Sequence, residues 1–248
     1  KKFKGKIDSI LIDPPYNSHI DYIGYKDSDY ESGYLNFMKE RLEIAKELLS
    51  NHGFLVINID EGESNNLFKL CKSLFGDAFV SMHKWKKKHP YFDVNRVVLN
   101  PNKKQTDYEY IIICKMSDSV FNLIKQPYLE NNLLKEKESG IPEVFDCFGT
   151  TSSAKDEINA LFGRRDYFST PKPLKLMTEL LRATSSKNSI VLDFFAGSGT
   201  VGHAVEILNK EDGGSRKYIL ISNSESNICR NVTVKRMELI NSKFTFLN

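Results

Sequence analysis

The chain has 248 residues, of which 40% are hydrophobic and 27% charged, which is typical of a globular domain. Basic residues number 35 and acidic residues 32, so the net charge of +3 identifies no partner by itself. No apolar run reaches the roughly 20 residues needed to span a bilayer, the start does not resemble a signal peptide, and the four cysteines are scattered without a C-x-x-C pair. We therefore expect a cytoplasmic α/β protein without disulfides or a metal site. Because the chain lacks an initial methionine, we also expect it to be a piece of a longer protein.

The first predicted strand ends in an acidic, proline-rich turn. Residues 9–12 are mainly apolar and β-branched, which favours a buried parallel strand, and Asp13, Pro14, Pro15 and Tyr16 follow directly. The prolines stiffen the turn and hold a carboxylate, carbonyl groups and an aromatic ring close together. Such a cluster can grip a flat base that carries an amino group, although an ordinary acidic turn is the simpler alternative.

A strand-helix rhythm follows. Residues 18–33 form a polar, tyrosine-rich loop, and residues 35–50 show the apolar spacing of an amphipathic helix. Residues 54–59 are a second buried strand ending at Asp60, and residues 67–75 form a short helix. This alternation predicts a mostly parallel sheet. Asp60 is either a residue that supports the site or an ordinary acid at a strand end.

A basic segment follows a further predicted strand over residues 79–85. A run of lysines is usually a solvated loop. Here aromatic residues such as Trp85 and Tyr91 lie among the lysines, which favours contact with a nucleic acid. The candidate DNA-binding residues are Lys84, Lys86, Lys87, Lys88, Lys103 and Lys104.

The second half begins irregularly and then regains its rhythm. After a strand at residues 110–114, residues 117–165 have no clear period, and we interpret them as an insertion for recognition. Ser169-Thr170-Pro171 predicts a helix start with proline at the first helical position. Residues 190–194 then form a strand, 195–200 a glycine turn, 201–208 a helix and 218–222 another strand.

The glycine turn predicts a second binding site. Glycines between a strand and a helix allow a ligand to approach the backbone closely. Asp193 at this turn would repel a diphosphate but attract an ammonium group, which disfavours the alternative of a nicotinamide-dependent oxidoreductase. Asn223 or Glu225, after the next strand, is placed to hold a ribose or adenine.

The two sites together resemble a known family. Asp13-Pro14-Pro15-Tyr16 and the segment from Asp193 to Thr200 resemble the catalytic and S-adenosylmethionine motifs of DNA amino-methyltransferases, and residues 168–173 look like a third motif beside the cofactor. The order of the motifs is similar to that of the beta group, and residues 202–205 and 209–214 look like the modification subunits of type III restriction systems. The segment between the motifs is short beside the recognition region of such subunits.

The resemblance implies a circularly permuted, Rossmann-like methyltransferase fold with helices on both faces of the sheet. It divides the chain into a catalytic half (1–116), a target-recognition insertion (117–165) and a cofactor-binding half (166–248). Asp13, Pro14, Pro15 and Tyr16 would be catalytic. The residues implied to bind S-adenosylmethionine are Phe168, Thr170, Pro171, Lys172, Asp193, Phe194, Ala196, Gly197, Ser198, Gly199, Thr200, Asn223 and Glu225.

The implied activity is methyl transfer to the N6 amino group of a flipped-out adenine in double-stranded DNA, without a metal or a membrane. A restriction subunit and a second copy of the chain are the candidate partners. Transfer to the N4 amino group of cytosine is an alternative, and so is a non-catalytic nucleic-acid-binding subunit. Methyl transfer requires Asp13 and Gly197 to face a common cleft, so their strands must be neighbours in the sheet.

Overall fold

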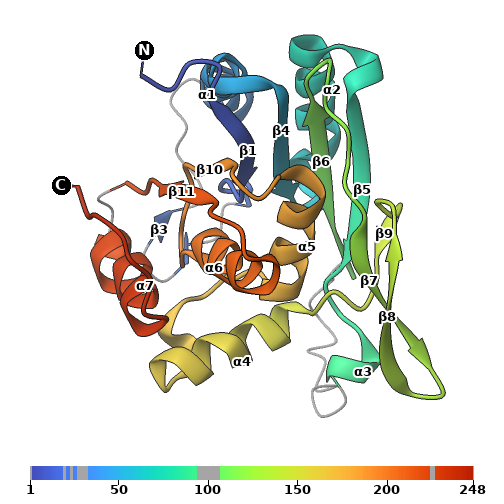
Figure 1. Cartoon of the computed structure of the whole chain (residues 1–248), viewed down its shortest axis with the longest axis vertical. Coiled ribbons are helices and arrows are strands. Elements are labelled where there is room, and N and C mark those ends of the chain that lie inside the picture. Colours follow the sequence, from blue (N-terminus) through green and yellow to red (C-terminus); the bar gives the residue numbers. More distant parts are fainter. Residues whose placement is uncertain are drawn as a thin grey trace.

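The computed structural model describes residues 2–18, 21–22, 25–26, 33–93, 107–223 and 227–247. At its centre is a seven-stranded sheet with the strand order β11-β10-β1-β4-β6-β5-β9 (Figure 1). Its strands are β1 (Ile7–Ile12), β4 (Leu49–Ile59), β5 (Val80–Lys86), β6 (Tyr108–Lys115), β9 (Val144–Phe145), β10 (Ile190–Asp193) and β11 (Lys217–Leu220). β6 runs antiparallel to both of its neighbours, and the other neighbouring strands pair in parallel. The predicted mostly parallel sheet is thus confirmed.

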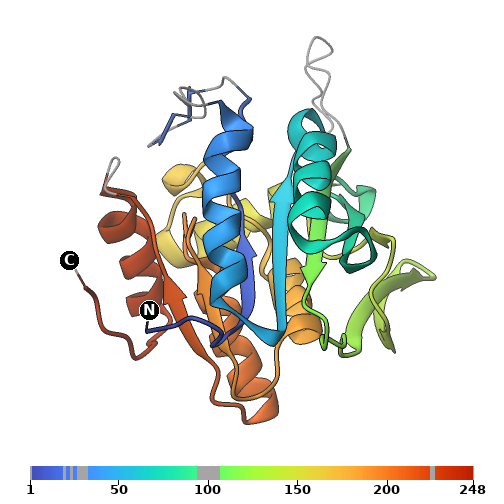
Figure 2. The same ribbon diagram turned by 90° about the horizontal axis from the view of Figure 1, so that it is seen from above.

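Helices cover both faces of this sheet, and each face has its own hydrophobic core (Figure 2). α1 (Tyr34–Leu48) and α2 (Glu61–Phe75) pack on one face, and α5 (Leu174–Thr184) and α6 (Thr200–Asp212) pack on the other. Successive β1 side chains alternate between the cores, since Leu11 joins the α5/α6 core and Ile10 and Ile12 join the α1/α2 core. Burial on both sides explains why β1 is apolar almost throughout.

The remaining elements lie around this centre. They are the short hairpin strands β2 (Asp21–Tyr22) and β3 (Tyr25–Lys26), the hairpin strands β7 (Ile124–Glu130) and β8 (Leu133–Ser139), the helices α3 (Pro90–Asp93), α4 (Thr151–Phe162) and α7 (Lys235–Leu239), the 3₁₀ turns Asp77–Phe79 and Arg165–Tyr167, and a π-helical segment at Cys229–Val234. Among the described residues, the helices are too short or too polar to cross a membrane.

The segment 117–165 is more regular than its sequence indicates, so the prediction of an irregular segment is wrong here. It contains the β7–β8 hairpin, turned by Asn131 and Asn132, which both have positive φ. It also supplies β9 to the central sheet and α4, whose start carries a capping box between Thr150 and Ser153. These local turn and capping signals were present in the sequence but lack the apolar periodicity that marks the other elements.

α5 starts later than predicted. Ser169-Thr170-Pro171 does not begin the helix, whose first residue is Leu174 with Pro173 as the preceding cap. A residue before proline avoids the helical region, so Pro171 and Pro173 keep the backbone extended until the second proline has passed. The backbone N–H of Leu174 donates to the carboxylate of Glu157, at 3.0 and 3.3 Å from its two oxygens.

Gly202 allows α6 to pack closely on β11 and α7. A Cβ atom at this position would lie 2.9 Å from Leu220 Cδ1 and 3.0 Å from Met237 Sδ. We expect Gly202→Val to lower the free energy of unfolding by about 1–3 kcal/mol through overpacking, measured by urea denaturation. Gly140→Val is the matched control, because a Cβ there meets nothing within 4 Å. Equal midpoints for the two variants would contradict this packing.

Candidate active site

Two strands that are far apart in sequence bring the two predicted motifs together. β1 and β10 pair in parallel, with Ser9 opposite Val191 and Ile10 opposite Leu192. Both strands therefore end at the same edge of the sheet, where Asp13 and Asp193 lie. The predicted adjacency of the two strands is confirmed, and this edge is where open α/β sheets carry ligand sites.

The Asp13 carboxylate is enclosed by donors. Tyr16 Oη donates to Asp13 Oδ1 at 2.7 Å, and Lys172 Nζ donates to Asp13 Oδ2 at 2.6 Å. Lys172 Nζ is also 2.6 Å from Tyr16 Oη and 5.0 Å from the centre of the Tyr16 ring. Burial raises the pKa of Asp13, and Lys172 opposes that shift. Lys172, predicted to line the cofactor site, therefore contacts the Asp13 carboxylate, which is predicted to be catalytic.

Glu109 completes this cluster, and the sequence prediction did not include it. It lies at the start of β6, and the antiparallel return of that strand brings it to the carboxyl edge of β4 and β1. Glu109 Oε2 lies 3.0 Å from Tyr16 Oη, close enough to accept its proton in place of Asp13, and 3.5 Å from Lys172 Nζ, while Oε1 lies 3.3 Å from Lys87 Nζ. Burial alone would raise the pKa of Glu109, but Lys172 and Lys87 outweigh it and hold the pKa below its ordinary value. The sequence signal that could have identified Glu109 is its position directly before the apolar residues of a predicted strand.

Asp193 has a different environment from Asp13. It is 3% exposed, and one of its oxygens accepts the backbone N–H of Phe195 at 3.0 Å. Burial raises the pKa of Asp193 to about 8, the Phe195 N–H lowers it, and the nearby Asp13 raises it. At neutral pH this carboxyl is therefore mostly protonated, and a positively charged ligand would ionise it.

The glycine turn is held from behind by a buried arginine. Gly197 and Gly199 have φ of 47° and 76°, a region that favours glycine. Arg236 Nη1 donates to the carbonyl of Ser198 at 3.4 Å and to the hydroxyl of Thr200 at 3.0 Å. Burial lowers the pKa of Arg236 to about 10, and Glu157 opposes that shift. No sequence pattern indicates this support, because it comes from a helix that follows the motif by more than 30 residues.

Of the other predicted cofactor residues, Phe168 and Ala196 lie at the glycine turn. The Phe168 ring lies 3.3 Å from where a Cβ on Gly197 would stand, and Ala196 N–H bonds to the Ile221 carbonyl at 3.0 Å. Phe194 packs on the α1/α2 core, and Asn223 follows β11. Thr170 and Pro171 form the extended approach to α5. Glu225 lies outside the described residues.

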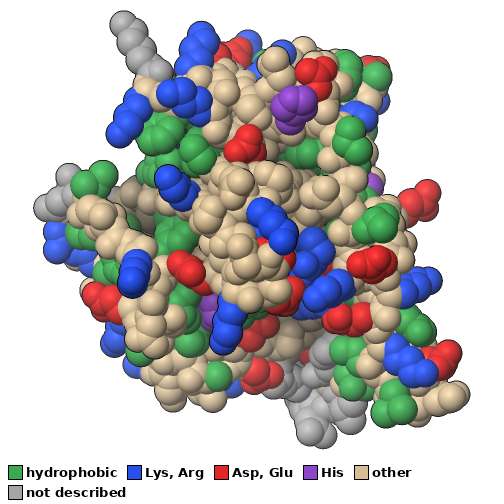
Figure 3. All heavy atoms as spheres, viewed as in Figure 1, with side chains coloured by type: hydrophobic (Ala, Val, Ile, Leu, Met, Phe, Trp, Pro, Cys, Tyr) green, Lys and Arg blue, Asp and Glu red, His purple; other side chains and the backbone are tan. Residues whose placement is uncertain are grey.

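Most of the predicted basic residues contact acidic or aromatic partners. Lys86 pairs with Asp146 at 3.5 Å, Lys88 with Asp107 at 3.4 Å and Lys87 with Glu109. Lys84 lies over the rings of Tyr108 and Tyr110, at 5.9 and 6.0 Å. On the face drawn in Figure 3, basic and acidic side chains are interspersed. Lys103 and Lys104 lie outside the described residues.

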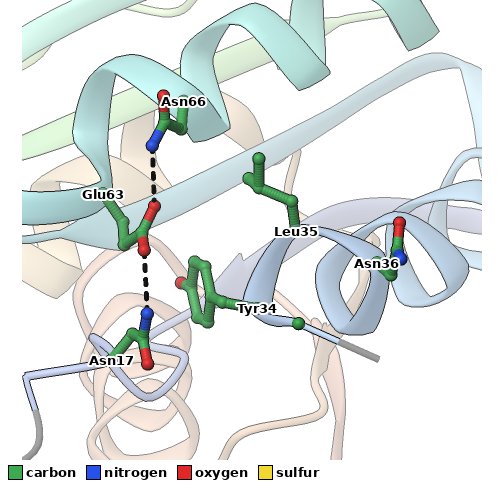
Figure 4. Close-up of a pocket in the computed structure, with 7 residues that line it drawn as sticks. Asn17, Tyr34, Leu35, Asn36, Glu63 and Asn66 are labelled. Carbon is green, nitrogen blue, oxygen red and sulfur yellow. Dashed lines mark hydrogen bonds between the residues drawn. The ribbon is translucent and has the colours of Figure 1, made fainter. Parts of the chain in front are cut away.

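A polar pocket of about 270 Å³ adjoins the Asp13 turn (Figure 4). Asn17, which has a φ of 58°, and Asn66 donate to the two oxygens of Glu63 at 2.9 and 3.1 Å. Tyr34 and Leu35 at the start of α1 form part of the opposite wall. Asp60 instead caps α2 by accepting the Gly62 N–H at 3.0 Å, which favours its interpretation as an ordinary acid at a strand end.

A histidine, an aspartate and a cysteine also gather near β9. The ligand atoms of His89, Asp146 and Cys147 all lie within 4.8 Å of one another. However, His89 Nδ1 accepts the Tyr91 N–H at 3.1 Å, so in the neutral ring Nε2 carries the proton and faces Asp146 at 3.5 Å. The three side chains therefore form a hydrogen-bonded cluster, in which Cys147 Sγ also lies 3.6 Å from His89 Nε2.

Solved structures of DNA methyltransferases share the fold. The PvuII DNA methyltransferase, described as cytosine-N4-specific, aligns with a TM-score of 0.59 over 96% of this chain and 86% of its own, at 14% identity. The complex of M1.HpyAVI with S-adenosylmethionine aligns with a TM-score of 0.55 over 93% of this chain and 89% of its own, at 20% identity. The chain thus has the α/β fold of the S-adenosylmethionine-dependent DNA methyltransferases, as predicted.

The sequence defines the family. The model of the DNA methylase family, which groups N6 and N4 methyltransferases, matches residues 7–233, and the chain belongs to this family. Its relatives include the StyLTI Mod subunit of a type III restriction-modification enzyme from Salmonella typhimurium. The two sequences are 26% identical over an alignment of 322 residues, which covers 86% of this chain and 48% of the relative. The chain spans about half the length of the type III subunits that it matches.

Proposed function

We propose that this chain transfers a methyl group from S-adenosylmethionine to the N6 amino group of an adenine in DNA. The observation that carries the proposal is the pairing of β1 with β10, because it puts the Asp13 turn and the glycine turn at one edge of the sheet. Each motif alone is an ordinary turn. Side by side, they offer a hydrogen-bond acceptor for an amino group next to a backbone that a small ligand can approach.

The residues around the glycine turn fit the cofactor. Gly197 and Gly199 have positive φ and pack closely on Phe168 and Thr233, where a Cβ would lie only 3.3 and 3.2 Å away, so the turn is a bare backbone held in a fixed shape. Asp193 offers a buried carboxyl to the ammonium group of the methionine moiety. When bound, S-adenosylmethionine supplies an activated methyl group on a sulfonium. The segment from Phe194 to Thr200 would hold the methionine end, with Asn223 or Glu225 at the ribose.

Asp13 and Pro14 would prepare the amino group. The lone pair of an adenine amino nitrogen is shared with the ring, so the nitrogen is a weak nucleophile. If the Asp13 carboxylate and the Pro14 carbonyl accept the two N–H bonds, the nitrogen becomes more tetrahedral and its lone pair is localised. Pro15 stiffens this turn, and the Tyr16 ring stacks on the base. The base must leave the duplex to reach these groups, at a cost of about a few kcal/mol.

The cytosine N4 amino group is a second candidate target. It requires the same chemistry, and one structural neighbour, the PvuII enzyme, is described as cytosine-N4-specific. An aspartate before the two prolines favours adenine within this group of enzymes.

The partners follow from the relatives. Several of them are Mod subunits of type III restriction-modification enzymes, which supports double-stranded DNA as substrate and a restriction subunit as partner. A second copy of the chain is a further candidate partner, and the cytoplasm is the proposed location. Residues 117–165 would contribute to target recognition between the catalytic and cofactor halves.

The proposal is tested by incubating the protein with unmethylated double-stranded DNA and S-adenosylmethionine labelled in the methyl group. The expected result is label in the DNA that resists washing and is lost on nuclease digestion. DNA binding without incorporated label would instead support the non-catalytic subunit. Reduction of a substrate by a nicotinamide cofactor would support the oxidoreductase.

Lys86 and Lys88 would bind the DNA backbone. Exchanging both for glutamine should flatten the dependence of log K on log salt by about one unit for each phosphate that the variant no longer neutralises. Binding measured by fluorescence anisotropy between low and moderate salt gives this slope. Lys4→Gln is the matched control, since Lys4 precedes β1 at the opposite edge of the sheet and pairs with Glu47. An unchanged slope in the double variant would show that these lysines belong to a solvated surface and do not bind DNA phosphates.

A further inference from the structure

The acceptor that the target amino group needs is already engaged by the protein. Asp13 Oδ1 receives the Tyr16 hydroxyl, and Asp13 Oδ2 receives the Lys172 ammonium at 2.6 Å. An amino group that approaches Asp13 presents the same kind of N–H donor as Lys172. A carboxylate has about four acceptor positions, but the Asp13 side chain is only 26% exposed and two protein donors already bind it, so the amino group and Lys172 compete for the part that remains accessible.

Lys172 cannot leave Asp13 without another anion. Its side chain is 6% exposed, and an ammonium left unpaired at that depth carries a large desolvation penalty. Glu109 meets this need, because its Oε2 lies 3.5 Å from Lys172 Nζ and its side chain is only 8% exposed. A small movement of Nζ turns this contact into a hydrogen bond.

Tyr16 links the two carboxylates. Its hydroxyl lies within hydrogen-bond distance of both Asp13 Oδ1 and Glu109 Oε2, at 2.7 and 3.0 Å, and accepts from Lys172 Nζ. The lysine can thus keep its bond to the hydroxyl while it changes carboxylates. Lys87, 3.3 Å from Glu109, partly neutralises the acid and prevents it from holding Lys172 permanently.

We infer that Lys172 occupies the place of the target amino group on Asp13 and transfers to Glu109 when the base enters. This inference rests on the proposed function. It assigns Glu109 and Lys172 as positioning residues. Through them, Asp13 selects a base whose amino group binds it well enough to displace Lys172. A base without that amino group offers Asp13 no hydrogen bond in place of Lys172, so the transfer of Lys172 to Glu109 is not favourable.

Binding of single-stranded oligonucleotides tests the exchange without turnover. One thymine-rich oligonucleotide carries a single adenine, and its partner carries purine, which lacks the 6-amino group. Affinities are measured with S-adenosylhomocysteine present, so that no methyl group can move. We expect the wild-type protein to bind the adenine oligonucleotide more tightly than the purine one.

Glu109→Gln should reduce this preference by about 10–100-fold, since a hydrogen bond to a charged group is worth about that much. Lys172 then has no carboxylate at position 109 to move to, so it stays on Asp13 and blocks it. The decisive variant combines Glu109→Gln with Lys172→Met, which removes the blocking donor and should restore the preference for adenine. Melting temperatures and cofactor affinity report whether each variant is folded.

A double variant that discriminates no better than Glu109→Gln would overturn the exchange, since a purely structural Glu109 predicts that result. The outcome is separable from the proposed function. If the double variant regains its preference for adenine but the wild-type protein transfers no methyl group, the exchange stands and the proposed function is wrong. If the wild-type protein transfers methyl groups but the double variant does not regain the preference, the function stands and the exchange is wrong.

Discussion

Replacing Asp13 by alanine should reduce methyl transfer by about 10²–10⁴-fold, the range for a positioned acid-base group or a preorganised acceptor. The loss arises because the variant has no carboxylate at the position that would accept the N–H of the base, and Lys172 would then pair with Glu109. Cofactor binding should remain measurable by calorimetry, since the glycine turn is formed by different residues. Initial rates with labelled cofactor give the ratio.

Asp60→Ala is the matched control for this experiment. Asp60 also ends a central strand, β4, at the same edge of the sheet, but it caps α2. Its loss should cost about 0.5–2 kcal/mol of stability while transfer is kept. Retained turnover in Asp13→Ala would contradict the mechanism, and a dead Asp60→Ala that is still folded would show that Asp60 supports the chemistry.

Binding of S-adenosylmethionine should release a proton from Asp193. The free protein holds this carboxyl protonated below its raised pKa of about 8, which burial causes, and the ammonium of the ligand favours the ionised form. Affinity should therefore rise with pH between about 6 and 8, by up to about tenfold per unit, and level off above the pKa. Calorimetry in two buffers of different ionisation enthalpy counts the released protons.

The same experiment on variants identifies the group that titrates. Asp193→Asn should bind about 10–100-fold more weakly, because it loses a charged hydrogen-bond partner, and should release no proton. Burial also raises the pKa of Glu157 to about 7, so Glu157→Gln is the control. Its carboxylate accepts the Leu174 N–H at the start of α5, so its replacement should leave the proton release unchanged. Equal proton release by the wild type and Asp193→Asn would contradict the assignment.

The sequence predicts those parts of the site that depend on local chemistry. Asp13 could be placed at a strand end because an apolar run stops at two prolines, and Gly197 at a turn because strand and helix patterns flank it. Their adjacency was a requirement of the implied activity, and the pairing of β1 with β10 confirms it.

The rest depends on tertiary structure. Glu109 reaches the site only because β6 runs antiparallel, and Arg236 only because a π-helical segment leads into α7 behind the glycine turn. Lys172 lies in a predicted motif, but its direction towards Asp13 is set by the two prolines that keep its backbone extended. Local patterns do not encode such long-range contacts.

Nucleoside analysis of DNA tests the central claim most directly. DNA from a host without methylation is incubated with the protein and labelled S-adenosylmethionine, digested to nucleosides and separated by chromatography. The proposed function predicts that the label elutes with N6-methyl-2′-deoxyadenosine. It also predicts that this labelled nucleoside is absent when Asp13→Ala replaces the wild-type protein. Label on N4-methylcytosine would move the target to cytosine, and DNA without any label would contradict the account.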